Sequence, residues 1–191
     1  MTSSAVRSTE SLAISEVPLC VDLDGTLVCS NTMIEEISIA ARKKPFHLLR
    51  ACLKLFWGRA EFKQSLASLR LLDVSNLPYR QSLLELIHRE RAKGRRIMLV
   101  TGAHQRTAEA IAQHVRCFDT ILSTCDGENL TGKAKRERLL ECCPGGFYYA
   151  GNSQSDLPVW QSSVGAILVG ASIRVQRSAA RCGINIVLTL K

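Results

Sequence analysis

The sequence lacks features that would place the protein across a membrane, in a secretory route or around structural zinc. It has no apolar run of about 18 residues, the length that a bilayer-spanning helix needs. Residues 1–16 are rich in Ser and Thr and hold no apolar stretch of signal-peptide length. The eight cysteines form no C-x-x-C pair and have no histidine partner at zinc-ligand spacing. We therefore expect a cytoplasmic protein with reduced, mostly buried thiols and a disordered leader over residues 1–16.

The sequence also has fewer acidic residues than basic ones. The chain of 191 residues carries 17 acidic residues against 25 Lys and Arg, a formal net charge of +8. This balance favours anionic partners such as phosphorylated substrates, nucleic acid or anionic lipid, but it does not choose among them. Apolar residues make up 46% of the chain, which suits a globular core, and the length fits one domain or one domain with a small insertion.

Short apolar segments alternate with helical patterns along most of the chain. Residues 18–23, PLCVDL, predict a buried strand that ends in an Asp-Gly turn. Further strands are predicted over residues 96–100, 147–150 and 166–169, with 120–123 as a weaker candidate. Helical periodicity lies between them, so we expect an α/β fold: a Rossmann-like three-layer sandwich whose parallel sheet has helices on both faces. In such sheets ligands bind at the carboxyl ends of the strands.

Two segments depart from this alternation. Residues 31–77 show helical periodicity without a convincing strand, which predicts a small helical cap inserted into a core formed by residues 17–30 and 78–191. Within this cap, residues 46–63 mix aromatic and basic side chains. We expect them to pack on the core, and an interfacial helix or a pocket for a lipid phosphate is the alternative. Residues 184–190, INIVLTL, fit either a last strand or the beginning of a further segment.

The clearest chemical signal is DLDGTL, residues 22–27, directly after the first predicted strand. Alternation along an extended chain places Asp22 and Asp24 on the same side, so two carboxylates converge at a strand end. Without a counter-charge they would repel each other and resist burial, which makes a bound divalent cation the natural resolution. Mg²⁺ suits oxygen ligands and phosphate substrates, so we predict a magnesium site that includes Asp22 and Asp24.

DLDGTL resembles the first motif of the haloacid dehalogenase-like superfamily. The resemblance implies that Asp22 is a nucleophile that forms an aspartyl-phosphate and that Asp24 is the general acid and base. Asp24 further implies phosphatase chemistry, because the dehalogenases and P-type ATPases of the superfamily have no Asp at that position. Thr101 and Gly102, which follow the strand predicted over residues 96–100, resemble the second motif, whose hydroxyl group binds the transferring phosphoryl group.

A lysine and a further acidic segment complete the resemblance. Lys133 and Lys135 are both candidates for the cation that balances the phosphoryl charge, and Lys135 is preferred because its position at the start of a predicted helix, four residues before Leu139, is similar to that of the family's motif lysine. Residues 151–156, GNSQSD, resemble the last motif, usually Gly-Asp with another Asp four residues later. Its first acidic position is Asn152 here, so the implied metal site has one negative charge fewer. The implied metal ligands are Asp22, Asp24, Asn152 and Asp156.

The wider pattern is similar to a subgroup that is often fused to UbiA-type intramembrane prenyltransferases. The segments that carry this similarity are PLCVDLDGTL, NLTGKAK and AGNSQSDLPVW. We therefore predict a Mg²⁺-dependent phosphate-monoester hydrolase with a small phosphorylated substrate, and a prenyl phosphate as the second choice. The alternative is a catalytically weak or inactive module that binds a phosphorylated ligand, or that works beside a membrane prenyltransferase at the inner face of a membrane. We expect no nucleic-acid partner.

Overall fold

The centre of the molecule is a six-stranded sheet with strand order β3-β2-β1-β4-β5-β6, in which every pair of neighbours runs parallel. This computed structural model describes residues 17–69, 71–124 and 129–191, so the leader expected over residues 1–16 lies outside the described residues. The α/β fold with a parallel sheet is confirmed, and residues 184–190 contribute an edge strand. The strands are β1 (Leu19–Val21), β2 (Ile97–His104), β3 (Thr120–Thr124), β4 (Tyr148–Gly151), β5 (Gly165–Val169) and β6 (Ile186–Leu190).

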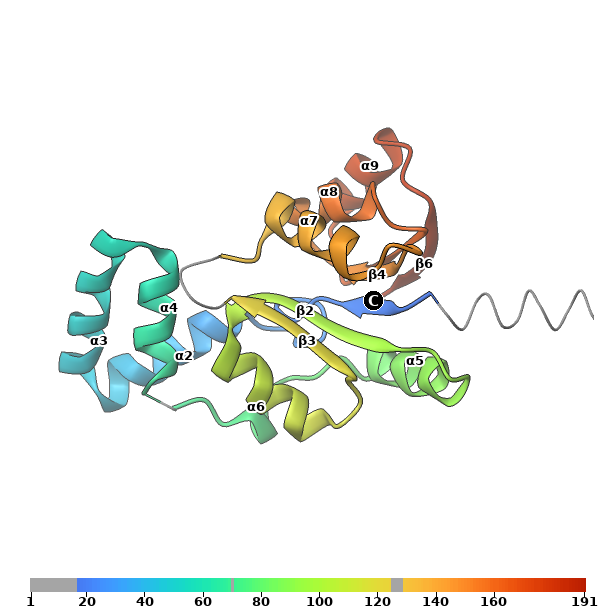
Figure 1. The fold of residues 1–191 in the computed structure, drawn as a ribbon. Helices are drawn as coiled ribbons and strands as arrows, with labels where there is room; N and C mark the ends of the chain where they lie inside the picture. The colour runs from blue at the N-terminus through green and yellow to red at the C-terminus, as the bar shows by residue number, and fades with distance from the viewer. Residues whose placement is uncertain (1–16, 70, 125–128) are drawn as a thin grey trace, which may run out of the picture.

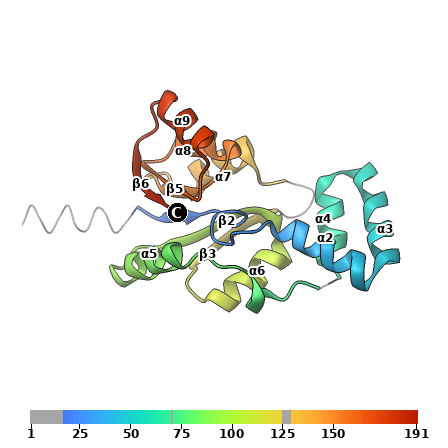
Figure 2. The same ribbon diagram turned by 180° about the vertical axis from the view of Figure 1, so that it is seen from behind.

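Helices cover both faces of the sheet. α5 (Gln81–Ala92) and α6 (Gln105–Val115) lie on one face, and α7 (Gly132–Cys142), α8 (Leu157–Trp160) and α9 (Ile173–Arg181) lie on the other (Figures 1 and 2). The short 3₁₀ helices η2 (Val74–Asn76) and η3 (Gln154–Asp156) precede α5 and α8. Strand order reverses between β1 and β4, the arrangement in which a crevice opens at the carboxyl ends of the strands.

Side-chain alternation along the strands divides the core into two layers. Leu19 and Val21 of β1 enter the apolar cluster beneath α5 and α6. Cys20, between them, enters the cluster beneath α7, α8 and α9. Because both layers are apolar, the strands read as continuous hydrophobic runs, which is why their positions could be predicted from sequence.

A separate group of helices stands beyond the carboxyl ends of the strands, and we call it the helical lobe (Figure 1). It consists of α2 (Thr32–Lys43), α3 (Pro45–Leu53), η1 (Lys54–Trp57) and α4 (Arg59–Ala67). Asn31 caps α2 by accepting a hydrogen bond from the backbone N–H of Ile34, and Pro45 occupies the first turn of α3. Ala40, Ala51, Phe62 and Leu66 form a small core inside the lobe.

The outer surface of the lobe corrects one expectation. Phe46, Phe56 and Trp57 are 80%, 88% and 71% exposed, so the prediction that this segment packs on the core is wrong for these three residues, whereas Phe62 is buried inside the lobe. Leu48 and Ala51, on the opposite side of α3, supply the contacts with the rest of the lobe. Helical periodicity identified which residues share a face of α3. It did not show that the face with Leu48 and Ala51, rather than the face with Phe46, is the one that packs.

The prediction of mostly buried thiols is also wrong. Cys20, Cys117 and Cys143 are buried, Cys142 is half-buried, and Cys29, Cys52 and Cys182 are exposed. The exposed thiols belong to loops and helix surfaces rather than to the strands, and Cys125 lies outside the described residues. In the described part of the chain, no helix combines the length and the apolar character that crossing a membrane requires.

Candidate active site

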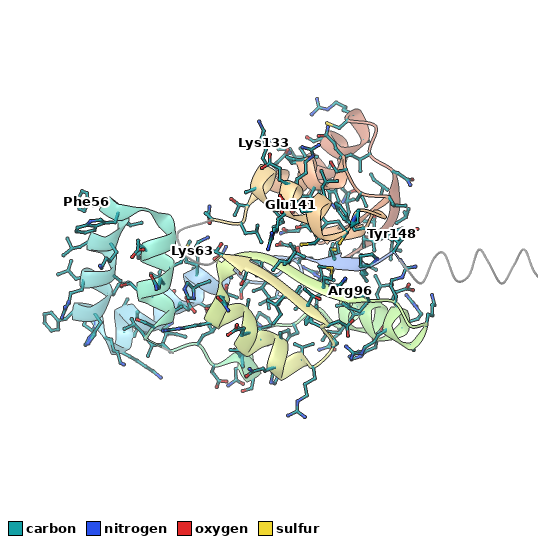
Figure 3. All side chains as sticks on the ribbon, viewed as in Figure 1. Phe56, Lys63, Arg96, Lys133, Glu141 and Tyr148 are labelled. Carbon is teal, nitrogen blue, oxygen red and sulfur yellow. The ribbon has the colours of Figure 1, made fainter. Side chains whose placement is uncertain are left out.

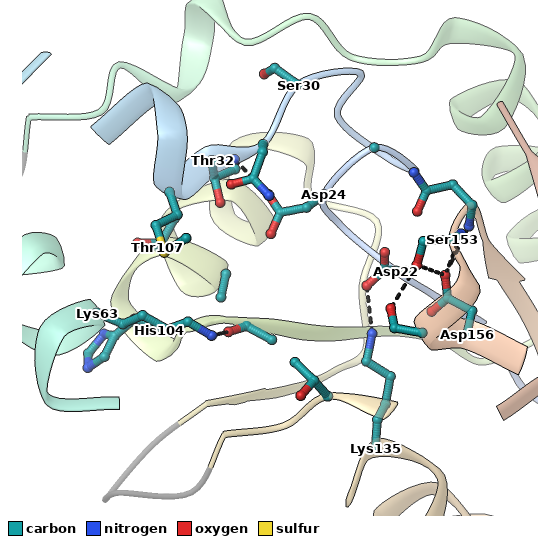
Figure 4. A pocket seen from close by; sticks show the side chains of 18 of the residues that line it. Asp22, Asp24, Ser30, Thr32, Lys63, His104, Thr107, Lys135, Ser153 and Asp156 are labelled. Carbon is teal, nitrogen blue, oxygen red and sulfur yellow. Dashed lines mark hydrogen bonds and ion pairs between the residues drawn. The ribbon is translucent and has the colours of Figure 1, made fainter. Parts of the chain in front are cut away.

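A pocket of about 440 Å³ opens between the helical lobe and the carboxyl ends of β1, β2 and β4 (Figure 4). The crevice at the reversal of strand order therefore coincides with a real cavity. Its lining includes most of the residues singled out from the sequence, together with residues from the lobe. The predicted residues that line it are Asp22, Asp24, Gly102, Lys135, Asn152 and Asp156.

Asp22 is held from both of its carboxylate oxygens. It follows β1 directly, and its backbone N–H donates to the carbonyl oxygen of Ala150 at 2.9 Å. Oδ1 accepts a hydrogen bond from Nζ of Lys135 at 2.6 Å, and Oδ2 accepts one from the hydroxyl group of Thr26 at 3.2 Å. Burial raises the pKa of Asp22 to about 6, and the positive charge of Lys135 opposes this rise. Near neutral pH the carboxylate is thus ionised and fixed in orientation.

Lys135 reaches this carboxylate from the first turn of α7. Its side chain is buried, and Nζ also donates to the hydroxyl oxygen of Tyr149 at 2.9 Å. Burial by itself lowers the pKa of Lys135, but the nearby carboxylates of Asp22 and Asp156 outweigh it, so the pKa lies above its usual value. The amine therefore stays charged.

Lys133, the other candidate, is exposed and points away from the sheet (Figure 3). Two positions along a helix turn through roughly 200°, which puts Lys133 and Lys135 on opposite faces. The structure therefore brings only Lys135 of this pair into the pocket.

Asp24 connects the loop that follows β1 to the helical lobe. Its Oδ1 accepts a hydrogen bond at 2.7 Å from the backbone N–H of Thr32, the first residue of α2. The intervening Gly25 has φ +75°, and an added Cβ would lie 2.1 Å from Nδ2 of Asn152. Only glycine allows this conformation together with so close an approach of the Asn152 side chain.

Arg80, which sequence reasoning missed, holds the backbone of the same loop after β1. Its Nη2 and Nε donate to the carbonyl oxygens of Gly25 and Thr26 at 3.3 Å and 3.2 Å. Arg80 is 54 positions from Thr26 in sequence, and nothing in its local pattern distinguishes it from the other arginines. These bonds leave the loop little freedom to move away from Asp22.

Asp156 has its two oxygens engaged within its own segment. Oδ2 accepts from the backbone N–H groups of Asn152 and Ser153 at 3.1 Å and 2.9 Å and from the Ser153 hydroxyl group at 3.0 Å. Oδ1 accepts from the hydroxyl group of Tyr149 at 3.0 Å. This arrangement favours a role in which Asp156 orders the loop that presents Asn152. Tyr149 was not singled out from the sequence, because it lies inside an apolar strand pattern.

The predicted second motif is only partly open to the pocket. Gly102 lines it, whereas Thr101 is fully buried and its hydroxyl oxygen accepts a hydrogen bond from the backbone N–H of Ala103 at 2.9 Å. Lys63 of α4 also lines the pocket, and its Nζ donates to the carbonyl oxygen of Gly102 and to Oδ1 of Asn129, the latter at 2.6 Å. Lys63 thereby connects the helical lobe to the end of β2, a contact that no sequence pattern predicted.

Glu36 is an acidic residue of the lobe that sequence reasoning also missed. It is 8% exposed, lines the pocket and accepts a hydrogen bond from the hydroxyl group of Thr107 at 2.8 Å. Burial raises the pKa of Glu36 to about 7, with the Thr107 hydrogen bond opposing this rise. His104 caps the start of α6, where its Nδ1 accepts a hydrogen bond from the backbone N–H of Arg106 at 3.2 Å, and it also lines the pocket. His104 and Thr107, the hydrogen-bond partner of Glu36, lie on the side of the cavity away from Lys135 (Figure 4).

The oxygen atoms around the pocket fit a hard divalent cation. Asp22 and Asp24 offer carboxylates and Asn152 offers an amide oxygen, the donor types that Mg²⁺ prefers. Within residues 17–69, 71–124 and 129–191, no three Asp, Glu, His or Cys side chains gather closely enough to hold a metal ion. The donor set therefore fits Mg²⁺ with two carboxylates and an amide, and with less negative charge than three acids would supply.

Comparison with known proteins places this site in a family. A model of the haloacid dehalogenase-like hydrolases matches residues 19–161, which include the segments that form the pocket. The chain belongs to the haloacid dehalogenase-like hydrolase family. The chain is 38% identical over 171 residues to the uncharacterized protein y4nM of Sinorhizobium fredii (strain NBRC 101917 / NGR234), with 90% of this chain and 33% of the relative covered. The chain thus spans about a third of the length of that relative.

Solved structures share the fold of this haloacid dehalogenase-like hydrolase at low sequence identity. A protein of unknown function from Bordetella pertussis Tohama I superposes with a TM-score of 0.69 at 15% identity, covering 91% of this chain and 97% of that chain. A phospho-aspartyl intermediate analogue of phosphoserine phosphatase superposes with a TM-score of 0.58 at 18% identity, covering 91% and 92%. At identities this low, the structural similarity shows a common fold and no more.

Proposed function

We propose that the protein hydrolyses phosphate monoesters through an aspartyl-phosphate intermediate on Asp22. The observation that carries the proposal is the contact between the Asp22 carboxylate and Lys135, at the head of a pocket that Asp24 also lines. A carboxylate that is buried, ionised and fixed in orientation is suited to attack phosphorus. The shared fold with a phosphoserine phosphatase captured as a phospho-aspartyl analogue supports the same chemistry.

The reaction would proceed in two steps. An oxygen of Asp22 bonds to phosphorus while the bond to the leaving oxygen breaks, and Asp24 donates a proton to that leaving oxygen. A water molecule then attacks phosphorus, Asp24 accepts a proton from it, and the bond between phosphorus and Asp22 breaks to release inorganic phosphate. Lys135 stays protonated and offsets negative charge that accumulates beside Asp22.

Mg²⁺ is the cofactor that we propose for this reaction. The residues that would hold it are Asp22, Asp24 and Asn152, while Asp156, whose Oδ2 accepts three hydrogen bonds from Asn152 and Ser153, orders the loop that presents Asn152. When bound, Mg²⁺ would shield the carboxylates from the phosphoryl oxygens.

The pocket supports a small, polar substrate. Its volume of about 440 Å³ is at the lower end of the range for ligand sites, and the lobe contributes the charged side chains of Glu36 and Lys63 to its lining. A prenyl phosphate would need a longer apolar channel, so it remains the second choice. The similarity to domains fused with UbiA-type prenyltransferases stays a prediction.

The test is phosphate release from an aryl phosphate and from a panel of small polar and prenyl phosphates, with and without added Mg²⁺. We expect magnesium-dependent turnover that Asp22→Asn lowers by at least about 10³-fold. Glu141→Gln, which removes an exposed carboxylate outside the pocket, is the matched control and should keep full activity. Undiminished turnover in Asp22→Asn would remove Asp22 from the mechanism.

A second candidate function is a binding module that holds a phosphorylated ligand with little or no turnover. Asn152 is the observation that favours it, because an amide replaces a carboxylate among the proposed metal ligands. This candidate predicts that a phosphate ester protects the wild-type protein from thermal unfolding while no phosphate is released from any ester in the panel. Turnover of one ester would exclude it.

A further inference from the structure

The outer face of α3 and η1 carries a cluster of large apolar side chains that nothing in the described structure covers. Phe46, Leu49 and Leu53 recur at helical spacing along one side of α3, and η1 continues the surface. We call this surface the lobe patch. Its members are Phe46 (80% exposed), Leu49 (63%), Leu53 (52%), Leu55 (51%), Phe56 (88%) and Trp57 (71%).

Clustering distinguishes the lobe patch from ordinary exposed apolar residues. Single exposed hydrophobic side chains are normal on soluble proteins, but contiguous groups mark interaction surfaces. Leu140, Val164 and Ile173, which are also exposed, lie apart from one another on α7, in the loop before β5 and on α9. The lobe patch instead gathers six on adjoining elements, three of them aromatic.

The charge around the patch has one sign. Exposed Lys43 and Lys44 precede the patch, and exposed Arg50 and Lys54 lie between its apolar members. The sequence has no acidic residue between Glu36 and Glu61. Nζ of Lys54 lies 5.4 Å from the centre of the Trp57 ring, so a basic and an aromatic side chain of the surface form a cation–π contact. Aromatic side chains flanked by Lys and Arg are suited to the boundary between lipid headgroups and acyl chains.

We propose that the lobe patch docks the protein on the surface of an anionic lipid bilayer. Phe46, Phe56 and Trp57 would enter the acyl boundary, while the long basic side chains keep their charges at the level of the phosphate groups. Charge complementarity selects this occupant. A second copy of the same patch would bring two sets of basic residues together, and a neutral apolar partner would leave those charges without counter-charges.

The patch and the pocket belong to different sides of the lobe. Phe56 projects outward at the far end of the molecule, whereas Lys63 of α4 points toward the core and the pocket (Figure 3). Docking through the patch therefore leaves the pocket residues of α2 and α4 in place. The inference is independent of the proposed phosphatase activity, because a vesicle-binding experiment requires no turnover.

The experiment uses the position of the two tryptophans. Trp57 lies in the patch and is 71% exposed, whereas Trp160 is 1% exposed in the core, so any lipid-dependent change in emission reports on Trp57. The full chain is titrated with vesicles of phosphatidylcholine alone and of phosphatidylcholine with phosphatidylglycerol, and binding is measured in parallel by co-sedimentation. We expect a blue shift and sedimentation with the anionic vesicles, both weakened by salt. Trp57→Phe should abolish the blue shift while sedimentation persists.

Paired variants separate the patch from general surface properties. Phe46→Ser with Phe56→Ser should lower the partition coefficient at least tenfold, while Ile173→Ser, an exposed apolar residue on α9, should leave it unchanged. Arg50→Gln with Lys54→Gln should lower it roughly fivefold for each charge removed. Arg174→Gln with Arg177→Gln, two exposed arginines on α9, is the charge control. Circular dichroism melting confirms that each variant is folded.

Three results would overturn the proposal. The first is wild-type protein that neither shifts its emission nor sediments at millimolar lipid. The second is equal binding to neutral and anionic vesicles, or equal losses in the patch variants and the α9 controls. The third is self-association in sedimentation velocity, without vesicle binding, that the Phe46→Ser and Phe56→Ser changes abolish.

Discussion

Replacing Lys135 by Met tests whether its buried ion pair with Asp22 organises the active site. Nζ of Lys135 lies 2.6 Å from Oδ1 of Asp22, and the two side chains are 5% and 11% exposed. At an effective dielectric constant of about 20, a contact of this length provides about 6 kcal/mol of Coulomb attraction, and the desolvation of both charges offsets much of it. Removing one partner leaves a buried carboxylate without its counter-charge, which costs about 3–5 kcal/mol.

We therefore expect Lys135→Met to lower the free energy of unfolding by about 3 kcal/mol at pH 8. The double variant with Asp22→Asn should lose much less than the sum of the two single variants, because no unpaired carboxylate remains at position 22. The assay is urea unfolding of wild type, both single variants and the double variant, with EDTA present to remove metal. A coupling energy below about 0.5 kcal/mol would refute the reasoning.

Lys133→Met is the matched control for this cycle. Lys133 lies two positions earlier, is exposed and lies outside the pocket, so its replacement should change the free energy of unfolding by less than about 0.5 kcal/mol. The same pair separates the two lysines in catalysis. Lys135→Met should lower turnover by at least about 10²-fold, and Lys133→Met should leave it near the wild-type value.

Three further predictions concern Glu36, Arg80 and Asn152. The pKa of Glu36 is raised to about 7, so the wild-type protein loses stability as pH rises from about 4.5 to 7. In melting curves, the free energy of unfolding of Glu36→Gln relative to wild type should therefore be higher at pH 8 than at pH 5, by up to about 3 kcal/mol. The same difference between the two proteins at both pH values would contradict this. Arg80→Met removes both donors to the carbonyl oxygens of Gly25 and Thr26, so it should lower the free energy of unfolding by about 1–3 kcal/mol in urea and also lower kcat. Unchanged values would show that the loop keeps its conformation without these hydrogen bonds. Asn152→Asp should lower the Mg²⁺ concentration for half-maximal activity at least tenfold, and no change would place Asn152 outside the metal site.

The residues that could be predicted from the sequence are those whose signal is local. Asp22 and Lys135 each adjoin a recognisable element, a buried strand and a helix start, and parallel strands necessarily bring their carboxyl ends to one edge. Helical geometry then puts Lys135 and Lys133 on opposite faces, and the structure shows that Lys135 is the one that lines the pocket. The predictable part of the site is therefore the part that the order of strands and helices determines.

Contacts between distant segments account for the residues that were missed. Arg80 binds a loop 54 positions away, and Lys63 binds the end of β2 across 39 positions, so neither contact leaves a periodic trace near the residue itself. Glu36 is one of two adjacent glutamates on α2, and only packing against Thr107 distinguishes it from the other. The lobe patch illustrates the same limit, because periodicity defines a helix face without showing what lies against it.

The hydrogen bonds around Tyr149 give Asn152 a physical context. Lys135 donates to Asp22 and to Tyr149, and Tyr149 donates to Asp156, which in turn holds the backbone N–H of Asn152. One lysine thus already balances two buried carboxylates. A third carboxylate at position 152 would add repulsion to this cluster whenever the metal is absent, whereas an amide provides an oxygen without a charge. At the proposed magnesium site, Asn instead of Asp at position 152 would therefore weaken the attraction for Mg²⁺ and, for the same reason, stabilise the metal-free protein.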